Sequence, residues 1–184
     1  ELLTAAAFSW FANIAVDVAV VEVGMLGRYD ATNVADGIVA VITNVDYEHL
    51  ENYGSMERLN ESFLDFINKV PFSALAVLSS DDVPLRALFP RIVKRYHTYG
   101  LQEREGGGPD FKATDVSLKQ WGAEFRAHFR GRNLGPFRLA IPGIHNVSNA
   151  LAAIAIGLEL DVPVDLIRKA LAAYAGVERR FHLR

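Results

Sequence analysis

Acidic, amide and imidazole side chains follow two apolar runs of the sequence. The first run, 16–24, carries Glu22 near its end. The second, 37–45, leads into a polar stretch that contains Asn44, Asp46, Glu48 and His49. Carboxylates suit a hard cation such as Mg²⁺, and an imidazole can take one site or orient a bound water. Ordinary turn and helix-terminus roles are an equal alternative, because polar residues are common where strands end.

A second group of polar side chains lies in PGIHNVSNALAA, residues 142–153. His145, Asn146 and Asn149 fall in the first turn or so of an expected helix. The two asparagines are three residues apart and share a helix face. Side-chain amides offer a donor and an acceptor together, which suits the edge of a nucleobase. The alternative is simple capping of the helix N-terminus.

Adjacent arginines at 179 and 180 follow the last expected helix. The guanidinium of Arg180 is a planar fork that can bind two phosphate oxygens at once. The alternative is a solvated basic end that favours the helix C-terminus.

Strand and helix patterns alternate through the first hundred residues. The β-branched runs 16–24 and 37–45 predict strands buried on both faces. The apolar run 73–82, which ends in polar residues, predicts a third buried strand, and 94–101 predicts a fourth. Helical spacing predicts helices at 1–13, 56–70 and 83–90. We therefore expect an α/β fold with a mostly parallel, Rossmann-like sheet flanked by helices.

The pattern changes after a glycine-rich loop. Residues 108–141 alternate apolar and polar positions and predict a small antiparallel β subdomain. Two helices should follow, the first Ala-rich and the second beginning at Pro163 and closed by Gly176. The whole chain, 1–184, is expected to form a single domain.

Composition narrows the class of protein. The chain has 51% hydrophobic residues, a net charge of −3 and no cysteine. These values predict a cytoplasmic protein with no nucleic-acid or membrane partner, and they exclude disulfides and thiolate metal sites. The first residue is not Met and lies in a helical pattern, so we expect a piece of a longer protein. The oligomeric state stays open.

Taken together, TNVDYEHLENYGS, FLDFINKVPF, PGIHNVSNALAA and GVERRF resemble the central, ATP-binding domain of the Mur ligase superfamily. The resemblance covers essentially all 184 residues and implies an ATP-dependent amide ligase that works through an acyl phosphate. It implies that Glu22 and His49 bind Mg²⁺ and that Arg180 faces the phosphates. It also implies that the adenine lies by Asn146 and Asn149, next to His145, and that Thr43 and Asn44 line the same site.

Two branches of this superfamily are combined. Residues 1–36, with LTAAAFSWF and VDVAVVEVGMLGRYDATNV, resemble folylpolyglutamate synthase, although Leu26 replaces a usual Gly. Residues from about 41 resemble UDP-N-acetylmuramate–L-alanine ligase, and Phe63 stands where many relatives carry a lysine. The favoured function is addition of L-alanine to the UDP-sugar acid. A glutamate ligase acting on folate, or an inactive recombined or designed scaffold, is the alternative.

The phosphate-binding motif G-x-x-x-x-G-K-[ST] is absent from the 184 residues, which contain no Gly-Lys pair. The resemblance places this motif just before residue 1 and a further, amino-acid-binding domain after residue 184. We therefore expect the isolated chain to be inactive as an enzyme.

Overall fold

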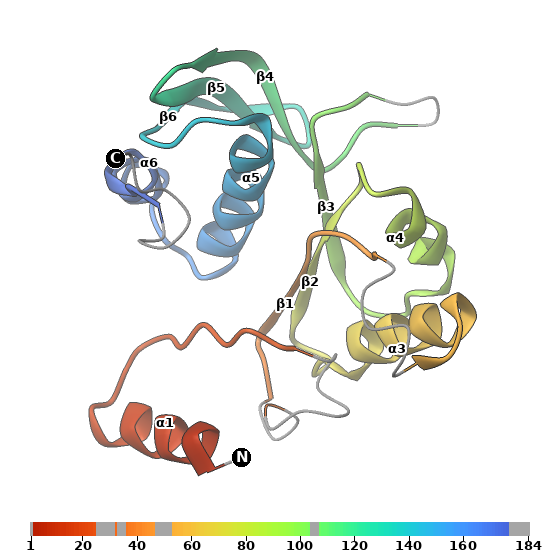
Figure 1. Ribbon diagram of the computed structural model, residues 1–184. Helices are drawn as coiled ribbons and strands as arrows, with labels where there is room; N and C mark the ends of the chain where they lie inside the picture. The colour runs from red at the N-terminus through yellow and green to blue at the C-terminus, as the bar shows by residue number, and fades with distance from the viewer. Residues whose placement is uncertain (1, 25–31, 33–35, 47–52, 104–106, 177–184) are drawn as a thin grey trace.

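A six-stranded sheet forms the centre of the molecule in the computed structural model, which describes residues 2–24, 32, 36–46, 53–103 and 107–176 (Figure 1). Its strands lie in chain order, and β1 to β4 run parallel while β4, β5 and β6 pair antiparallel. Their bounds are β1 Val39–Ile42, β2 Leu75–Ser79, β3 Tyr96–Gly100, β4 Phe111–Lys119, β5 Gly122–Phe129 and β6 Arg132–Leu139.

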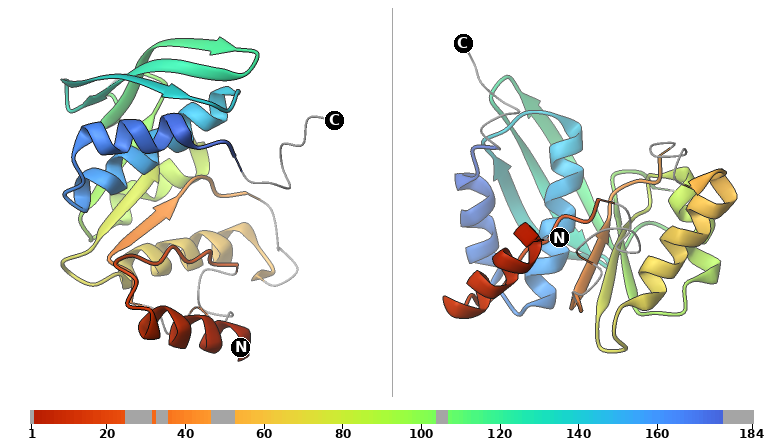
Figure 2. Two further views of the ribbon diagram at one scale, coloured as in Figure 1. Left: turned by 90° about the vertical axis from the view of Figure 1, so that its left-hand side faces the viewer. Right: turned by 60° about the horizontal axis from the view of Figure 1, so that its bottom comes forward.

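Helices cover both faces of this sheet. The helices of the described residues are α1 Leu2–Asn13, α3 Met56–Lys69, α4 Val83–Leu88, the short 3-10 helix η2 Phe89–Arg91, α5 Ile144–Glu159 and α6 Val164–Ala173. Figures 1 and 2 show α3 and α4 on one side and α5 and α6 on the other, with α1 standing apart. Among the described helices, none combines the length and the apolar character needed to cross a bilayer.

The central strand β2 shows why the chain needs both layers. All five of its residues are buried. Leu75 and Val77 join the core under α5, whereas Ala76 and Leu78 join the core under α3 and α4. Successive side chains of a strand point to opposite faces, so a continuous apolar run requires cover on both sides. The expected α/β class is confirmed.

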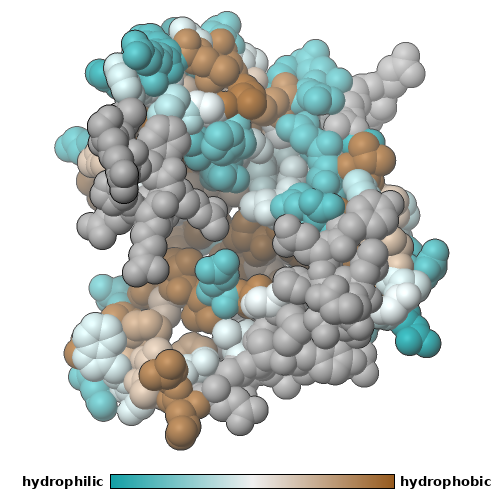
Figure 3. All heavy atoms as spheres, viewed as in Figure 1, coloured by the Kyte–Doolittle hydropathy of each residue, from teal (hydrophilic) through white to brown (hydrophobic). Residues whose placement is uncertain are grey.

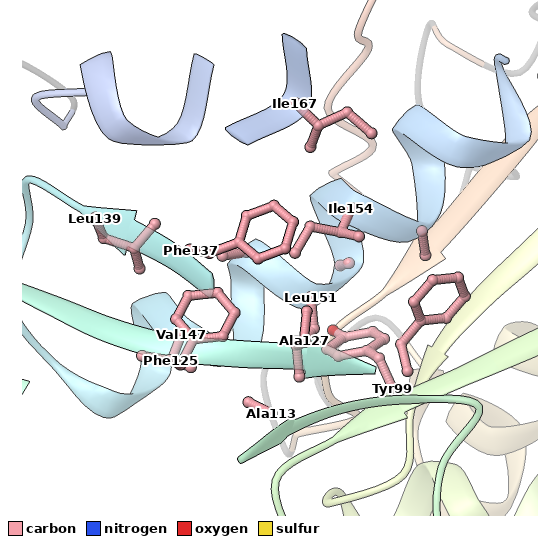
Figure 4. Packing of buried hydrophobic residues seen from close by; sticks show 14 of the residues in the cluster. Tyr99, Ala113, Phe125, Ala127, Phe137, Leu139, Val147, Leu151, Ile154 and Ile167 are labelled. Atoms are coloured by element: carbon pink, nitrogen blue, oxygen red, sulfur yellow. The ribbon is translucent and has the colours of Figure 1, made fainter. Parts of the chain in front are cut away.

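The larger core lies between α5, α6 and the antiparallel strands (Figure 4). Phe125 and Phe137 stack with ring centroids 5.7 Å apart. Leu151 and Ile154 of α5 are fully buried against this side of the sheet, and Ile167 of α6 closes it. Removing this apolar surface from water provides the main force that holds the helices on the sheet.

The predicted antiparallel meander is present, and it extends the parallel sheet. β4 joins β3 through only two residue pairs, Tyr99 with Phe111 and Gly100 with Lys112. A two-residue turn connects β5 to β6, with φ of 48° at Arg130 and 81° at Gly131. Positive φ at both positions is the geometry of the turn that matches the twist of paired strands.

The prediction of a buried strand at 16–24 is wrong. No part of this segment is in a strand, none of its residues is buried, and Val20 is 95% exposed. A β-branched run is stable as a strand when it packs on a pleated surface beside a partner. Residues 16–24 have neither in this structure, because they cross from α1 towards β1 outside the sheet (Figure 1).

Helix α1 forms as predicted but buries none of its residues. Leu2 and Leu3 are almost fully exposed, and Trp10 is more than half exposed. Figure 3 shows hydrophobic side chains at the surface over this helix. Apolar residues lie on nearly all sides of α1, so the sequence does not define a single face for packing.

The end of the last helix also differs from the prediction. Pro163 precedes α6 as expected, and its carbonyl accepts bonds from Leu166 and Ile167. The helix ends at Ala173, because Tyr174 adopts an extended conformation (φ −71°, ψ 111°). Gly176, with φ of 96°, therefore lies beyond the helix and does not cap it.

Candidate functional site

A cleft of about 380 Å³ lies beyond the carboxyl ends of β1, β2 and β3, beside the start of α5. In open α/β sheets this is the edge at which ligands bind. The residues that line the cleft are Thr43, Asn44, Asp81, Tyr99, Leu101, Ile144, His145, Ser148 and Asn149.

The β1 side of the cleft is formed by two exposed polar residues that directly follow the strand. The Thr43 hydroxyl donates a hydrogen bond of 2.9 Å to Oδ1 of Asn44. This bond fixes the orientation of the amide and uses its oxygen. The Asn44 NH₂ group is thus presented as a donor.

The α5 side depends on the turn at Pro142 and Gly143. Gly143 has a φ of 107°, and a Cβ atom there would lie 2.6 Å from Cε1 of His145. Glycine therefore allows the imidazole to fold back over the turn. No side chain caps this helix N-terminus, so the capping alternative for the asparagines does not describe the structure.

The two asparagines of α5 differ in their surroundings. Asn149 is exposed and lines the cleft. Asn146 donates from Nδ2 to the carbonyl of Pro142 at 2.7 Å, and its own backbone N–H bonds to Gly143. Asn146 therefore holds the turn, whereas Asn149 is an exposed residue of the cleft wall.

The third wall comes from the ends of β2 and β3. Asp81 accepts backbone N–H groups from Leu101 at 2.7 Å and from Gln102 at 3.3 Å. Tyr99 is buried behind them, and this burial raises the pKa of its phenol to about 12. The phenol consequently remains a neutral hydroxyl across the physiological range.

The chemistry of these walls is mostly that of neutral donors and acceptors. Among the described lining residues, Asp81 is the only acidic residue, and none is a lysine or an arginine. Amides and hydroxyls suit the base and sugar of a nucleoside, whereas a phosphate requires cations. In residues 2–24, 32, 36–46, 53–103 and 107–176 there is no group of three or more acidic or histidine residues that could hold a metal ion.

The structure brings together part of the predicted site. Asn44, which follows β1, shares one cleft with His145 and Asn149 of α5. Glu22 is exposed at the end of the segment 16–24 and is not among the lining residues. His49 and Arg180 lie outside the described residues, so the Glu22–His49 metal pair stays a prediction.

Sequence reasoning gave no role to the lining residues Asp81, Tyr99, Leu101, Ile144 and Ser148. The sequence carried a signal for Asp81, because this residue lies in the polar end of the run 73–82, which was predicted to be a buried strand. Tyr99 and Leu101 carried no such signal, since an apolar or aromatic residue near a strand end is more often part of the core.

A second cleft, of about 470 Å³, lies at α6 and the antiparallel strands. Phe125, Phe137 and Ala172 contribute to its walls, and Arg168 crosses it with bonds to the carbonyls of Leu134 and Pro136. Of the predicted site residues that the structure describes, none lines this second cleft, so the strand-end cleft remains the candidate site.

Comparison with known families identifies the class of this chain. The profile of the Mur ligase middle domain matches residues 3–157. The chain therefore belongs to the Mur ligase family, as the resemblance of its motifs predicted.

The similar curated proteins are named UDP-N-acetylmuramate–L-alanine ligase. The protein from Geobacter sp. (strain M21) is 45% identical over 146 residues, which are 79% of this chain and 31% of the relative. The protein from Solibacter usitatus is 46% identical over 147 residues, or 80% of this chain and 30% of the relative. The chain thus spans about a third of the length of these relatives.

Solved structures agree on the fold. MurF from Acinetobacter baumannii has a TM-score of 0.66 at 27% identity, covering 80% of this chain and 31% of that one. An FPGS–AMPPCP–folate complex has a TM-score of 0.77 at 24% identity, covering 97% of this chain and 43% of that one. Both branches named from the motifs therefore appear among the similar proteins.

Proposed function

We propose that the strand-end cleft binds the nucleoside part of ATP. The observation that carries this proposal is the presence of Asn44 on the β1 side, and of His145 and Asn149 on the α5 side, of one cleft at the carboxyl edge of the sheet. Membership of the Mur ligase family supports ATP as the nucleotide. The neutral donors and acceptors of the walls suit a base and a sugar better than a phosphate.

In this proposal the amide of Asn149 contacts the adenine edge, and Asn146 keeps α5 in place by holding Pro142. Asn44 donates its NH₂ group from the opposite wall. The triphosphate extends away from these residues, towards Arg180. Charge develops on the transferred phosphoryl group, and a guanidinium placed there would stabilise it.

The proposal includes Mg²⁺, which Glu22 and His49 would bind. Of this pair the structure describes Glu22, an exposed carboxylate that is accessible to an ion. The metal would neutralise charge on the phosphate oxygens. Asp46, also exposed, and Glu48 would orient bound water or His49 from outside the ligand shell.

For the parent protein we propose ligation of L-alanine to UDP-N-acetylmuramate in the cytoplasm, through an acyl phosphate and with release of ADP. The support is the name shared by the relatives at about 45% identity. Glutamate addition to a folate is the second candidate, supported by the fold of the FPGS complex. Turnover of the complete gene product with L-alanine and with L-glutamate separates the two, and Glu22→Ala or His49→Ala should abolish it.

Titration calorimetry of the 184-residue chain with Mg–ADP tests the binding proposal. We expect saturable binding that Asn149→Ala weakens about three- to tenfold, as expected for one lost hydrogen bond. Asn13→Ala is the matched control, because Asn13 is an exposed asparagine at the end of α1. We expect no ATPase activity, since the chain carries no phosphate-loop motif.

The rival interpretation is a folded scaffold whose site residues have lost their role. Absence of any saturable heat with Mg–ADP at millimolar concentration would favour it. Equal affinity in the wild type and in Asn149→Ala would show instead that the nucleotide binds elsewhere.

A further inference from the structure

We propose that Asp81 is a positioning residue of the nucleotide cleft: it holds the backbone that follows β3 in place and so sets the shape of one wall. This inference rests on the proposed nucleotide binding. It assigns Asp81 no contact with the reacting atoms.

Both carboxylate oxygens of Asp81 are used for this purpose. Oδ2 accepts the N–H of Leu101 at 2.7 Å, and Oδ1 accepts the N–H of Gln102 at 3.3 Å. Leu101 and Asp81 themselves line the cleft. A carboxylate that accepts two backbone N–H groups restrains the segment more strongly than one neutral bond, because bonds to a charged acceptor are shorter and stronger.

Close packing at the ends of β2 and β3 supports this arrangement. A Cβ atom on Gly100 would lie 2.4 Å from Oγ of Ser80 and 2.8 Å from Oδ1 of Asp81. Ser80 is itself fixed, since its N–H and its hydroxyl both bond to the carbonyl of Tyr99. Glycine at position 100 thus allows the Asp81 carboxylate to come close enough to reach the next two backbone N–H groups.

The neighbouring Asp82 also accepts two backbone N–H groups, on the opposite side of β2, but it does so with a single oxygen, Oδ1. Its Oδ1 accepts the N–H of Leu85 at 2.8 Å as the cap of α4, and it also accepts the N–H of Val45 at 3.3 Å. Val45 follows Asn44 at the other wall. The two adjacent aspartates therefore tie β2 to the segments that follow its two neighbouring strands.

This difference supplies an internal control. An asparagine at 82 keeps an oxygen at Oδ1 and can retain both bonds. An asparagine at 81 must replace one oxygen by an NH₂ group, which then faces a backbone N–H. Asp81→Asn should therefore release Leu101 or Gln102, whereas Asp82→Asn should preserve its contacts.

The first experiment needs no ligand: amide hydrogen exchange of the 184-residue chain, measured residue by residue. In Asp81→Asn we expect protection to fall about tenfold or more at one of the two amides, Leu101 or Gln102, with Val45 unchanged. In Asp82→Asn we expect all three to be unchanged, and in Asp82→Ala protection should fall at Val45. Unchanged protection at Leu101 and Gln102 in Asp81→Asn would overturn the inference, whether or not the chain binds a nucleotide.

The second experiment measures the affinity of the same variants for Mg–ADP and Mg–2′-deoxy-ADP. Asp81→Asn should weaken both nucleotides about tenfold and leave their ratio at the wild-type value, because a misplaced wall acts on either ligand. Unchanged affinity despite lost protection would refute a positioning role. If the ratio of the affinities for Mg–ADP and Mg–2′-deoxy-ADP fell to about one in Asp81→Asn alone, Asp81 would contact the ribose directly. That result would also refute the positioning role. Failure of the wild type to bind Mg–ADP would count against the proposed function, while the exchange measurement still decides whether Asp81 holds the wall.

Discussion

The strand β2 (LAVLS) and the segment 16–24 (VDVAVVEVG) are both mainly apolar, yet they differ in structure. β2 pairs with β1 on one side and β3 on the other, and its five residues are buried. The segment 16–24 has no strand assignment and no buried residue. The difference shows that β-branched composition favours a strand only where partners and covering layers exist.

The same contrast extends to the helices. α5 is Ala-rich and apolar, as α1 is, but six of its residues are buried against the sheet. α1 buries none. Helical stability in proteins comes mainly from tertiary packing of one face, so these two helices should contribute very differently to folding.

Core truncation should give the largest effect that tests this contrast. Leu78→Ala removes a fully buried side chain of β2 and should lower the free energy of unfolding by about 2–5 kcal/mol. Leu2→Ala is the matched control, since Leu2 is 88% exposed, and its effect should be about 0.5 kcal/mol or less. Denaturant midpoints measure both, and similar losses in the two variants would contradict the distinction between the regions.

Acidification should weaken the sheet through His97 at the start of β3. Burial lowers the pKa of His97 below 6.5, and Arg130 and Arg95 add to this, while Asp110 opposes it. His97 therefore binds a proton more tightly in the unfolded chain than in the folded one. The free energy of unfolding is highest above pH 6.5 in this respect, and it decreases as the pH falls through the lowered pKa of folded His97. His97→Gln should remove this part of the pH dependence, as followed by urea unfolding between pH 7.5 and 5.

A second loss is expected at lower pH from Asp110. Burial raises the pKa of this carboxyl, but hydrogen bonds from the Thr98 backbone and from Arg130 outweigh burial, and the net pKa lies below 3.8. Its contribution is therefore present above pH 3.8 and lost below it. Asp110→Asn should reduce the slope of stability against pH below pH 3.8. Because the Asp110 charge raises the pKa of His97, the same variant should also enlarge the loss of stability that His97 causes below pH 6.5. An unchanged slope below pH 3.8 would contradict the assignment to Asp110.

Deletion of residues 2–13 should give the smallest effect. Because α1 buries no residue, its removal should change the free energy of unfolding of the sheet by about 0.5 kcal/mol or less. It should also improve solubility, since Leu2, Leu3 and Trp10 are exposed apolar groups. A loss of several kcal/mol on deletion would show that α1 packs on the sheet in solution.

Much of the fold followed from the sequence because its signals were local. The run 73–82 predicted β2, helical spacing predicted α3 within one residue, and Pro163 marked the start of α6. The segment 16–24 carried an equally strong local signal, but its outcome depended on neighbours that no local pattern specifies. The position of Gly176 beyond α6 depended on the backbone of Tyr174, which composition does not define.

The candidate site was predictable in outline from the resemblance to the Mur ligase family. The resemblance implied that Asn44, His145 and Asn149 belong to one nucleotide site, and the structure has all three at one cleft at the carboxyl edge of the sheet. The different surroundings of Asn146 and Asn149 could not be predicted, because Asn146 bonds to the carbonyl of Pro142 and this contact is seen only in the structure. Asp81 accepts hydrogen bonds from backbone N–H groups that follow β3 and are far from it in the sequence, and no sequence motif indicates such a contact.

The narrow junction between β3 and β4 has one further consequence. Only two residue pairs join the strands there, whereas α5 packs against β2, β3, β4 and β5 alike. Helix α5 therefore packs across the junction between β3 and β4 and helps to hold these strands together. The same helix contributes His145 and Asn149 to the cleft. Separation of the two parts of the sheet at this junction would therefore also disturb the end of α5 that lines the cleft.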